Sequence, residues 1–243
     1  MPGFQVHIAA SSVVGAGYGV AAWYLGGMPP TTCALGAGLC AVSGMLPDLD
    51  SGPGVPLRES VAFAAAVVPL LMLPRFQQWG LPLEGVILAA AAVYIAIRFG
   101  LTWLLENHVK HRGMFHSLPA AAIAGQFTFL AFGGEEPLRR YFVAGAVVLG
   151  FLSHLVLDEI WAVRMGLFGP KVKKSFGTAM KFTGPDLWPN LLAYGIVIAL
   201  GAIAASDAAW TERIAAVRQH MEHATRTYQQ PYQQPYPNGQ FRR

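Results

Sequence analysis

Three short segments of the chain carry side chains that are able to bind a divalent metal ion. They are Pro47–Asp50, His111–His116 and Ser153–Asp158, and each stands at the end of an apolar run. The chain as a whole is 54% hydrophobic and only 12% charged. Ionisable groups are costly in lipid and usually mark functional positions there. Since histidine and aspartate together suit borderline or hard divalent ions, the pattern predicts a metal centre.

His154 and Asp158 stand four residues apart near the end of a predicted helix. At this spacing both side chains project from one helix face. They are suited to be two ligands of one ion, or one ligand and the carboxylate that orients it. A buried hydrogen-bonded pair that joins two helices is the alternative interpretation. Glu159 points about 100° away around the helix, so we expect it to orient ligands rather than to bind the ion.

Asp48 and Asp50 follow Pro47 in a predicted tight turn. Two carboxylates in such a turn can reach one cation from the two sides of the backbone. The alternative is an ordinary solvated turn, where aspartate is common because its side chain bonds the nearby backbone. His7 opens the first apolar run and lies on the same predicted face as the other candidates, so we include it among the ligands rather than treat it as merely interfacial.

Residues 110–117, with the sequence KHRGMFHS, are predicted to lead into a helix for which Ser117 is a suitable N-cap. His111 and His116 are expected to be two ligands, or a ligand and a general acid. Arg112 is expected to hold an anionic group, because a guanidinium binds phosphate or carboxylate through paired hydrogen bonds. The alternative interpretation of this segment is a basic loop without a role in chemistry.

Seven apolar runs must position these side chains. The mean hydropathy of +0.42 is typical of a polytopic membrane protein, and a membrane span needs about 20 apolar residues. The sequence therefore predicts an all-α fold, a polytopic membrane helix bundle with about six or seven spans and a disordered C-terminal tail. The runs are Ile8–Leu25, Thr31–Leu46, Ser60–Leu73, Leu83–Leu105, Leu118–Phe132, Tyr141–Leu157 and Leu191–Ala205.

Counting the spans places all the candidate ligands on one face of the membrane. The same face carries most of the loop lysines and arginines, so the positive-inside rule predicts that it is cytoplasmic. We expect a multi-pass membrane protein. The basic residues on this face are Arg58, Lys110, Arg112, Arg164, Lys171, Lys173, Lys174 and Lys181, whereas Arg75, Arg139 and Arg140 lie on the other.

The predicted organisation has three parts: a membrane-embedded domain at 1–206, a polar C-terminal helix at 207–228 and a disordered Gln/Pro/Tyr tail at 229–243. The net charge of +4 resides in loops and in the tail rather than on one amphipathic face, so no nucleic-acid partner is expected. Cys33 and Cys40 stand two helical turns apart and cannot be linked within a straight helix, so both are predicted to be free and buried.

The order of these motifs resembles the YdjM-like family of inner-membrane proteins, which are described as membrane-bound metal-dependent hydrolases. The resemblance covers about residues 4–190 and includes Gly184–Pro189, a segment similar to the family's Leu-Trp-Pro turn. One departure is Phe115, where the family usually has threonine. The resemblance implies a ligand set drawn from His7, Asp48, His111, His116, His154 and Asp158.

The sequence therefore predicts a metal-dependent hydrolase that acts on a phosphoester or lipid-like ester through metal-activated water. The expected cofactor is a divalent ion, zinc or manganese, and the expected partners are the lipid bilayer and a phospholipid or phosphoester substrate. The main alternative is a non-catalytic membrane protein with a structural metal or a hydrogen-bonded His/Asp cluster. A solute transporter and a metal-free phosphatase are further alternatives; transport sites, however, are expected near the middle of the membrane.

Overall fold

The computed structural model describes residues 3–50, 55–104, 114–134, 136–166, 169–172 and 180–207, together with Thr211, Ala215 and Met221. The chain divides into two compact units, Met1–Ala204 and Ala205–Arg243. In the second unit Thr211, Ala215 and Met221 are described as helical. The rest of the predicted polar helix and the whole predicted tail lie outside the described residues.

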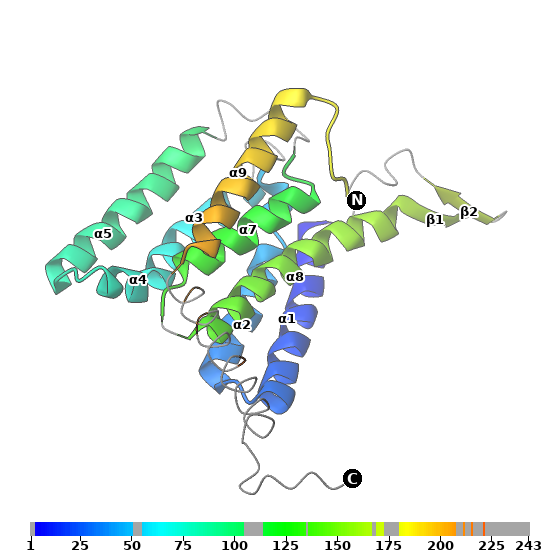
Figure 1. Ribbon diagram of the computed structural model, residues 1–243. Coiled ribbons are helices and arrows are strands. Elements are labelled where there is room, and N and C mark those ends of the chain that lie inside the picture. Colours follow the sequence, from blue (N-terminus) through cyan, green and yellow to red (C-terminus); the bar gives the residue numbers. More distant parts are fainter. Residues whose placement is uncertain are drawn as a thin grey trace, which may run out of the picture. The chain divides into compact units, whose positions relative to one another are not determined.

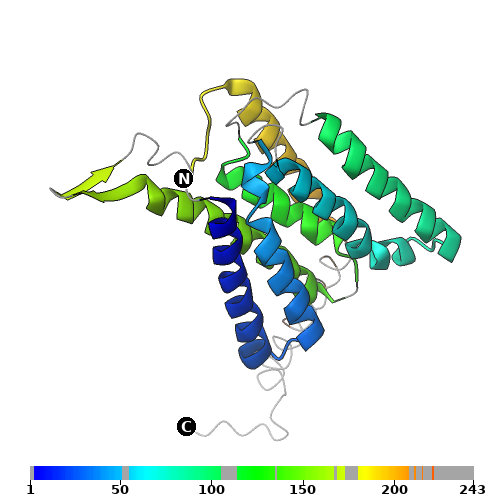
Figure 2. The same ribbon diagram turned by 180° about the vertical axis from the view of Figure 1, so that it is seen from behind.

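Four helices form the group that carries the candidate site (Figures 1 and 2). Helix α1 (Phe4–Gly26) packs along α2 (Pro30–Ser43), and both contact α8 (Pro137–Ala162). Helix α7 (Leu118–Ala131) packs on α8 as well. Gly27 ends α1 in the left-handed conformation, with φ of 61°, which glycine adopts without a steric penalty. The chain can therefore turn directly from α1 into α2.

Small residues allow α1, α2 and α8 to approach closely. A β-carbon on Gly15 would lie 2.5 Å from the Ala37 carbonyl oxygen. One on Gly150 would collide with the Cys40 carbonyl oxygen and the Ser43 hydroxyl. Close packing through small residues is a principal source of helix association in lipid, where the hydrophobic effect between helices is absent. It brings the ends of these helices within reach of one another's side chains.

A second group of helices lies beside the first. Helix α3 (Val55–Leu71) continues through α4 (Leu73–Gln78) to α5 (Leu83–Ile95), which runs into the π-helical turn η2 (Ala96–Leu101). Helix α3 packs on both α5 and η2. An apolar cluster surrounds the first turns of α3. In it the buried side chains of Leu57 and Val61 pack against Leu49, Ile97, Leu101 and Phe115.

Within the described residues, five helices are long and apolar enough to cross a bilayer, and two shorter apolar helices accompany them. Together they account for all seven predicted runs, which confirms the predicted membrane helix bundle. The short run Ser60–Leu73 belongs to a longer candidate span, because α4 extends α3. The candidate spans are Phe4–Gly26, Leu57–Gln78, Leu83–Leu104, Pro137–Ala162 and Leu187–Ala205, and the shorter helices are Pro30–Ser43 and Leu118–Ala131.

Three elements complete the described fold. The predicted turn after α2 is the 3₁₀ helix η1 (Leu46–Asp50). Strands β1 (Val163–Gly166) and β2 (Gly169–Val172) form an antiparallel hairpin after α8. Helix α9 (Leu187–Ala205) follows. The hairpin was not predicted, because strands of four residues are too short for a clear alternating pattern.

Candidate metal centre

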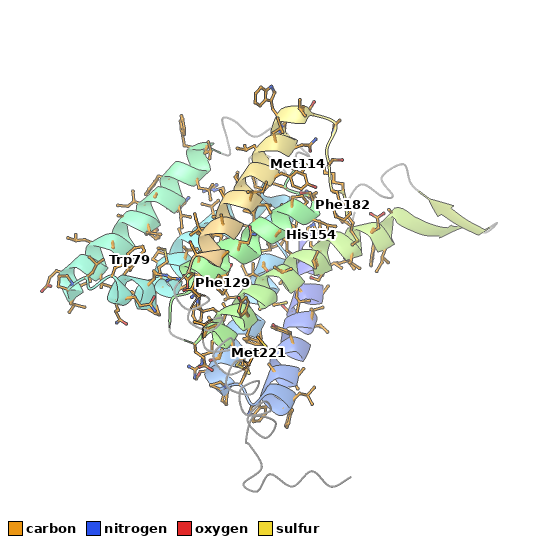
Figure 3. All side chains as sticks on the ribbon, in the orientation of Figure 1. Trp79, Met114, Phe129, His154, Phe182 and Met221 are labelled. Carbon is orange, nitrogen blue, oxygen red and sulfur yellow. The ribbon has the colours of Figure 1, made fainter. Side chains whose placement is uncertain are left out.

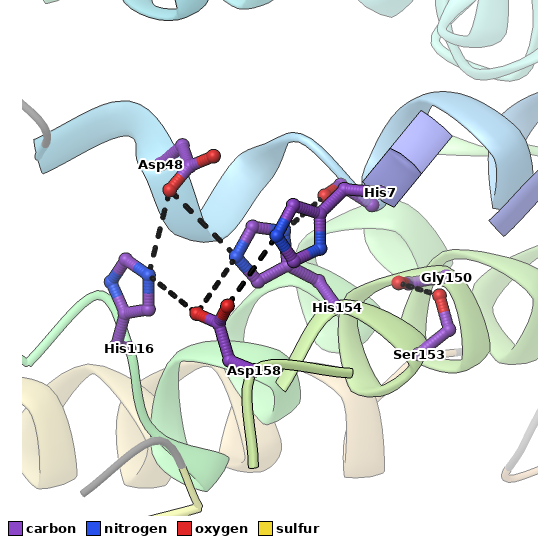
Figure 4. A network of polar contacts seen from close by, with 8 residues as sticks. His7, Asp48, His116, Gly150, Ser153, His154 and Asp158 are labelled. Atoms are coloured by element: carbon purple, nitrogen blue, oxygen red, sulfur yellow. Dashed lines mark hydrogen bonds and ion pairs between the residues drawn. The ribbon is translucent and has the colours of Figure 1, made fainter. Parts of the chain in front are cut away.

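Five polar side chains from four separate segments converge at one place (Figure 4). His7 comes from the first turn of α1, and Asp48 from the 3₁₀ helix η1. His116 lies just before α7, whereas His154 and Asp158 both come from α8. The predicted convergence is therefore found for all five of these residues.

Asp158 lies at the centre of the cluster. Its Oδ1 atom is 3.4 Å from Nε2 of His7. Its Oδ2 atom is 3.6 Å from Nε2 of His154 and 4.0 Å from Nε2 of His116. The two oxygens of this carboxylate thus face different imidazoles, so both oxygens are available to a ligand held between the rings.

Asp48 closes the cluster from the other side. Its Oδ1 atom is 3.6 Å from Nε2 of His116 and 3.7 Å from Nε2 of His154. Ligand atoms around a tetrahedral zinc ion stand about 3.3 Å apart, because each bond is about 2.0 Å long. The observed spacings are slightly wider than this value. The side chains are therefore near the separation that a bound cation requires, and only small movements would close the gap.

The orientation of His154 is set by the backbone. Its Nδ1 atom lies 2.6 Å from the carbonyl oxygen of Gly44, to which it donates a hydrogen bond. The proton on Nδ1 leaves the lone pair on Nε2, which points into the cluster. Metal-binding histidines are commonly held in this way, since the second nitrogen fixes both the tautomer and the ring.

His7 is held between two helices. Its ring stacks on that of His154, with the centroids 3.7 Å apart and the planes 15° from parallel. Ser11, one turn further along α1, places its hydroxyl 2.6 Å from the Ala41 carbonyl oxygen of α2 and 2.9 Å from the His7 carbonyl oxygen. The start of α1 is thereby fixed against α2 next to the site.

His116 is positioned by the beginning of α7. Ser117 is the N-cap of that helix, as predicted, and its hydroxyl accepts a hydrogen bond of 3.3 Å from the Ala120 amide. Pro119 stands in the first turn, where its missing N–H has no cost. The ligand candidate therefore immediately precedes a capped helix terminus.

The cluster has a buried side and an open side. His7, His154 and Asp158 are buried, whereas the side chains of Asp48 and His116 are 25% and 13% exposed. Burial raises the pKa of the Asp48 carboxyl, but the contact with His116 and the charge of a protonated His154 outweigh that effect. The pKa of Asp48 therefore lies below its ordinary value, and the carboxylate at the open side stays ionised.

The donor set fits a divalent cation. Two groups of three side chains have ligand atoms within 4.8 Å of one another: His7, His154 and Asp158, and Asp48, His116 and His154. Among the described residues, the buried atoms Nε2 of His154 and Oδ1 of Asp158 have no hydrogen-bond partner. Buried polar atoms are rarely left without one. A cation between the imidazoles and carboxylates would satisfy these atoms.

Not every predicted site residue can be placed. His111 and Arg112 lie outside the described residues, as does the side chain of Asp50. Glu159 is half-buried beside Asp158, and its orienting role stays a prediction. Sequence reasoning missed the Gly44 carbonyl, because any residue carries a carbonyl group and only the fold shows which one faces His154.

Comparison with known proteins identifies the family. Neither the curated proteins nor the solved structures give a match to this chain. The family described as YdjM inner membrane protein matches residues 1–219. The matched region contains all five converging side chains and the candidate membrane spans. The chain therefore belongs to the YdjM inner membrane protein family.

Proposed function

We propose that this protein is a metal-dependent hydrolase that cleaves a phosphoester or lipid-like ester at the cytoplasmic face of the inner membrane. The observation that carries the proposal is the convergence of His7, His116 and His154 with Asp48 and Asp158, at separations of 3.4–4.0 Å. Imidazole and carboxylate groups at this spacing are typical ligands of zinc and manganese in proteins.

The chemistry divides between the two sides of the cluster. A divalent cation held there, zinc or manganese, would supply Lewis acidity and would lower the pKa of a bound water to about 7. His7, His154 and Asp158 hold the buried side. Asp48 and His116 complete the ligand set at the open side, where a substrate approaches.

Aromatic side chains support a site at the level of the membrane surface. Three exposed tryptophans stand at those ends of their candidate spans that are nearer to the candidate site. They are Trp103, Trp161 and Trp188, whose exposed fractions are 61%, 46% and 80%. Tryptophan is enriched where lipid headgroups meet the hydrocarbon core. Trp161 follows Asp158 by less than one helical turn. A site at this depth suits a substrate whose scissile ester lies beside the headgroup of a lipid.

The cytoplasmic orientation rests on the loop charges. The lysines and arginines predicted on the motif face outnumber those on the opposite face. Lysine and arginine accumulate in short cytoplasmic loops of membrane proteins. Arg112 and His111 belong to the same face, and their predicted roles are to hold the anionic group of the substrate and to transfer a proton.

The alternative is a non-catalytic cluster that stabilises the helix ends. Asp48 and Asp158 lie near enough to the imidazoles to form ion pairs with them when the rings are protonated. In that case the cluster needs no cation. Metal content and activity together distinguish this alternative from a hydrolase.

The decisive experiment uses the full chain purified in detergent without chelator. We expect stoichiometric zinc or manganese, and chelator-sensitive release of product from a panel of phospholipids and soluble phosphoesters. The double variant His154→Ala/Asp158→Ala should lose both. Absence of metal from the wild type, or its retention in the double variant, would refute the metal centre. Activity that persists in chelator would point to a metal-free phosphatase, and metal without activity to a structural cluster.

A further inference from the structure

The backbone of residues 180–184, which we call the strap, is tied to the beginning of α9. The Gly184 amide donates a hydrogen bond of 2.7 Å to Oδ1 of Asn190, and Nδ2 of Asn190 donates one of 2.8 Å to the Gly184 carbonyl oxygen. One turn further along, the Tyr194 hydroxyl donates to the Phe182 carbonyl oxygen at 3.0 Å. A single face of α9 therefore holds two points of the strap.

The other edge of the strap is tied to the segment that carries His116. The Leu118 amide donates a hydrogen bond of 3.1 Å to the Lys181 carbonyl oxygen, and Ser117 pairs with Lys181 as an isolated parallel bridge. A β-carbon on Gly184 would lie 3.5 Å from the Met114 sulfur. Figure 3 labels Met114 and Phe182 in this region. The strap thus contacts the chain on both sides of His116.

His116 differs in its backbone setting from the three candidate ligands that stand within long helices. His7, His154 and Asp158 stand within long helices that pack on one another. His116 instead precedes the N-cap of α7 and so lies outside that helix. The strap supplies the neighbouring backbone with a partner from outside α7.

We propose that Asn190 is a positioning residue for His116, because it holds the strap that contacts the chain around His116. The part of this proposal that concerns metal binding rests on the function proposed above. The Asn190 amide both donates and accepts, and both bonds go to the backbone of Gly184. Alanine makes neither bond. Aspartate keeps only the acceptor and would place a second oxygen against the Gly184 carbonyl oxygen. Groups that hold metal ligands in place typically change metal affinity by about 10–100-fold when they are removed.

The first test measures the strap without reference to any metal. Hydrogen exchange of the full chain in detergent, in the presence of chelator, should accelerate at residues 114–118 and 181–184 in Asn190→Ala, with unchanged exchange in α8. Tyr194→Phe should accelerate the same segments less, because one hydrogen bond is lost. Leu191→Ala is the matched control, since Leu191 is 53% exposed and adjacent in α9. Unchanged exchange at 114–118 in Asn190→Ala would overturn the proposal.

The second test asks whether Asn190 acts through His116. Zinc affinity, measured by chelator competition, should fall about 10-fold in Asn190→Ala and in Asn190→Asp, and should be unchanged in Leu191→Ala. In a His116→Ala background, Asn190→Ala should cause no further loss. An equal loss in both backgrounds, or none in either, would overturn the positioning role. If the wild type binds no zinc, the metal centre is refuted, and the positioning of a metal ligand by Asn190 is refuted with it. The exchange experiment still decides whether Asn190 holds the strap against residues 114–118.

Discussion

The imidazole rings of His7 and His154 stack face to face, with centroids 3.7 Å apart, although one opens α1 and the other lies near the end of α8. Each of these rings offers a nitrogen to the same group of possible ligand atoms, which also includes a carboxylate oxygen of Asp158. Two helices that are remote in the sequence therefore contribute neighbouring ligands to one candidate site.

Replacement of Asp48 tests the open side of the cluster. Asp48→Asn keeps the shape of the side chain but removes the charge that faces His116 and His154. We expect zinc affinity to fall at least about 10-fold with little change in thermal stability, measured by chelator competition and by thermal unfolding. Asp186→Asn changes an exposed carboxylate and serves as the control. Equal affinities of the two variants would exclude Asp48 as a ligand.

Metal binding should weaken as the solution becomes acidic. Protons compete with the cation for imidazole nitrogens, which change charge between about pH 8 and about pH 5. Because the pKa of Asp48 is lowered, its carboxylate stays ionised across this range, and its contribution is lost only when the pH falls through that lowered value. The decline in zinc affinity therefore reports the histidines, and Asp48→Asn should keep the same pH profile at lower affinity. A flat profile between pH 8 and pH 5 would contradict binding by imidazoles.

Gly150 should be intolerant of even one added methyl group. It stands one turn before His154, and a β-carbon there would collide with the backbone of α2 at Cys40. We expect Gly150→Ala to destabilise the protein by about 1–3 kcal/mol, and to weaken zinc binding because His154 is displaced from the Gly44 carbonyl oxygen.

The control for this variant is Gly17→Ala in α1. A β-carbon on Gly17 meets nothing within 4 Å. This change should leave thermal stability and zinc affinity close to those of the wild type. If Gly150→Ala behaves like Gly17→Ala, the close approach of α8 and α2 does not set the position of His154.

Chemical labelling can test the proposed orientation. Cys33 and Cys40 are buried, so the native chain should react little with a membrane-impermeant maleimide. Trp79 and Phe182, both labelled in Figure 3, are 63% and 65% exposed on opposite predicted faces. In right-side-out vesicles we expect labelling of Trp79→Cys but not of Phe182→Cys. Inside-out vesicles should give the reverse, and the opposite pattern would place the site outside the cytoplasm.

Local sequence patterns were sufficient for the helices and for several details of the site. The apolar runs predicted the five candidate spans and the two shorter apolar helices of the described residues, because helix formation in lipid depends on apolar length within one segment. The capping role of Ser117 was likewise predictable, since it depends on the residues that immediately follow. The burial of Cys33 and Cys40 followed from their place in an apolar run.

The sequence by itself determined which residue types are available and which turn of each helix carries them. Only the tertiary structure decided that Asp158 lies between three imidazoles, that Gly44 orients His154, and that the strap supports the chain around His116. The physical reason is that helical periodicity is a local property of a few consecutive residues. The distance between α1, η1 and α8 depends instead on contacts between remote small residues, such as Gly150 against Cys40, which no local pattern encodes.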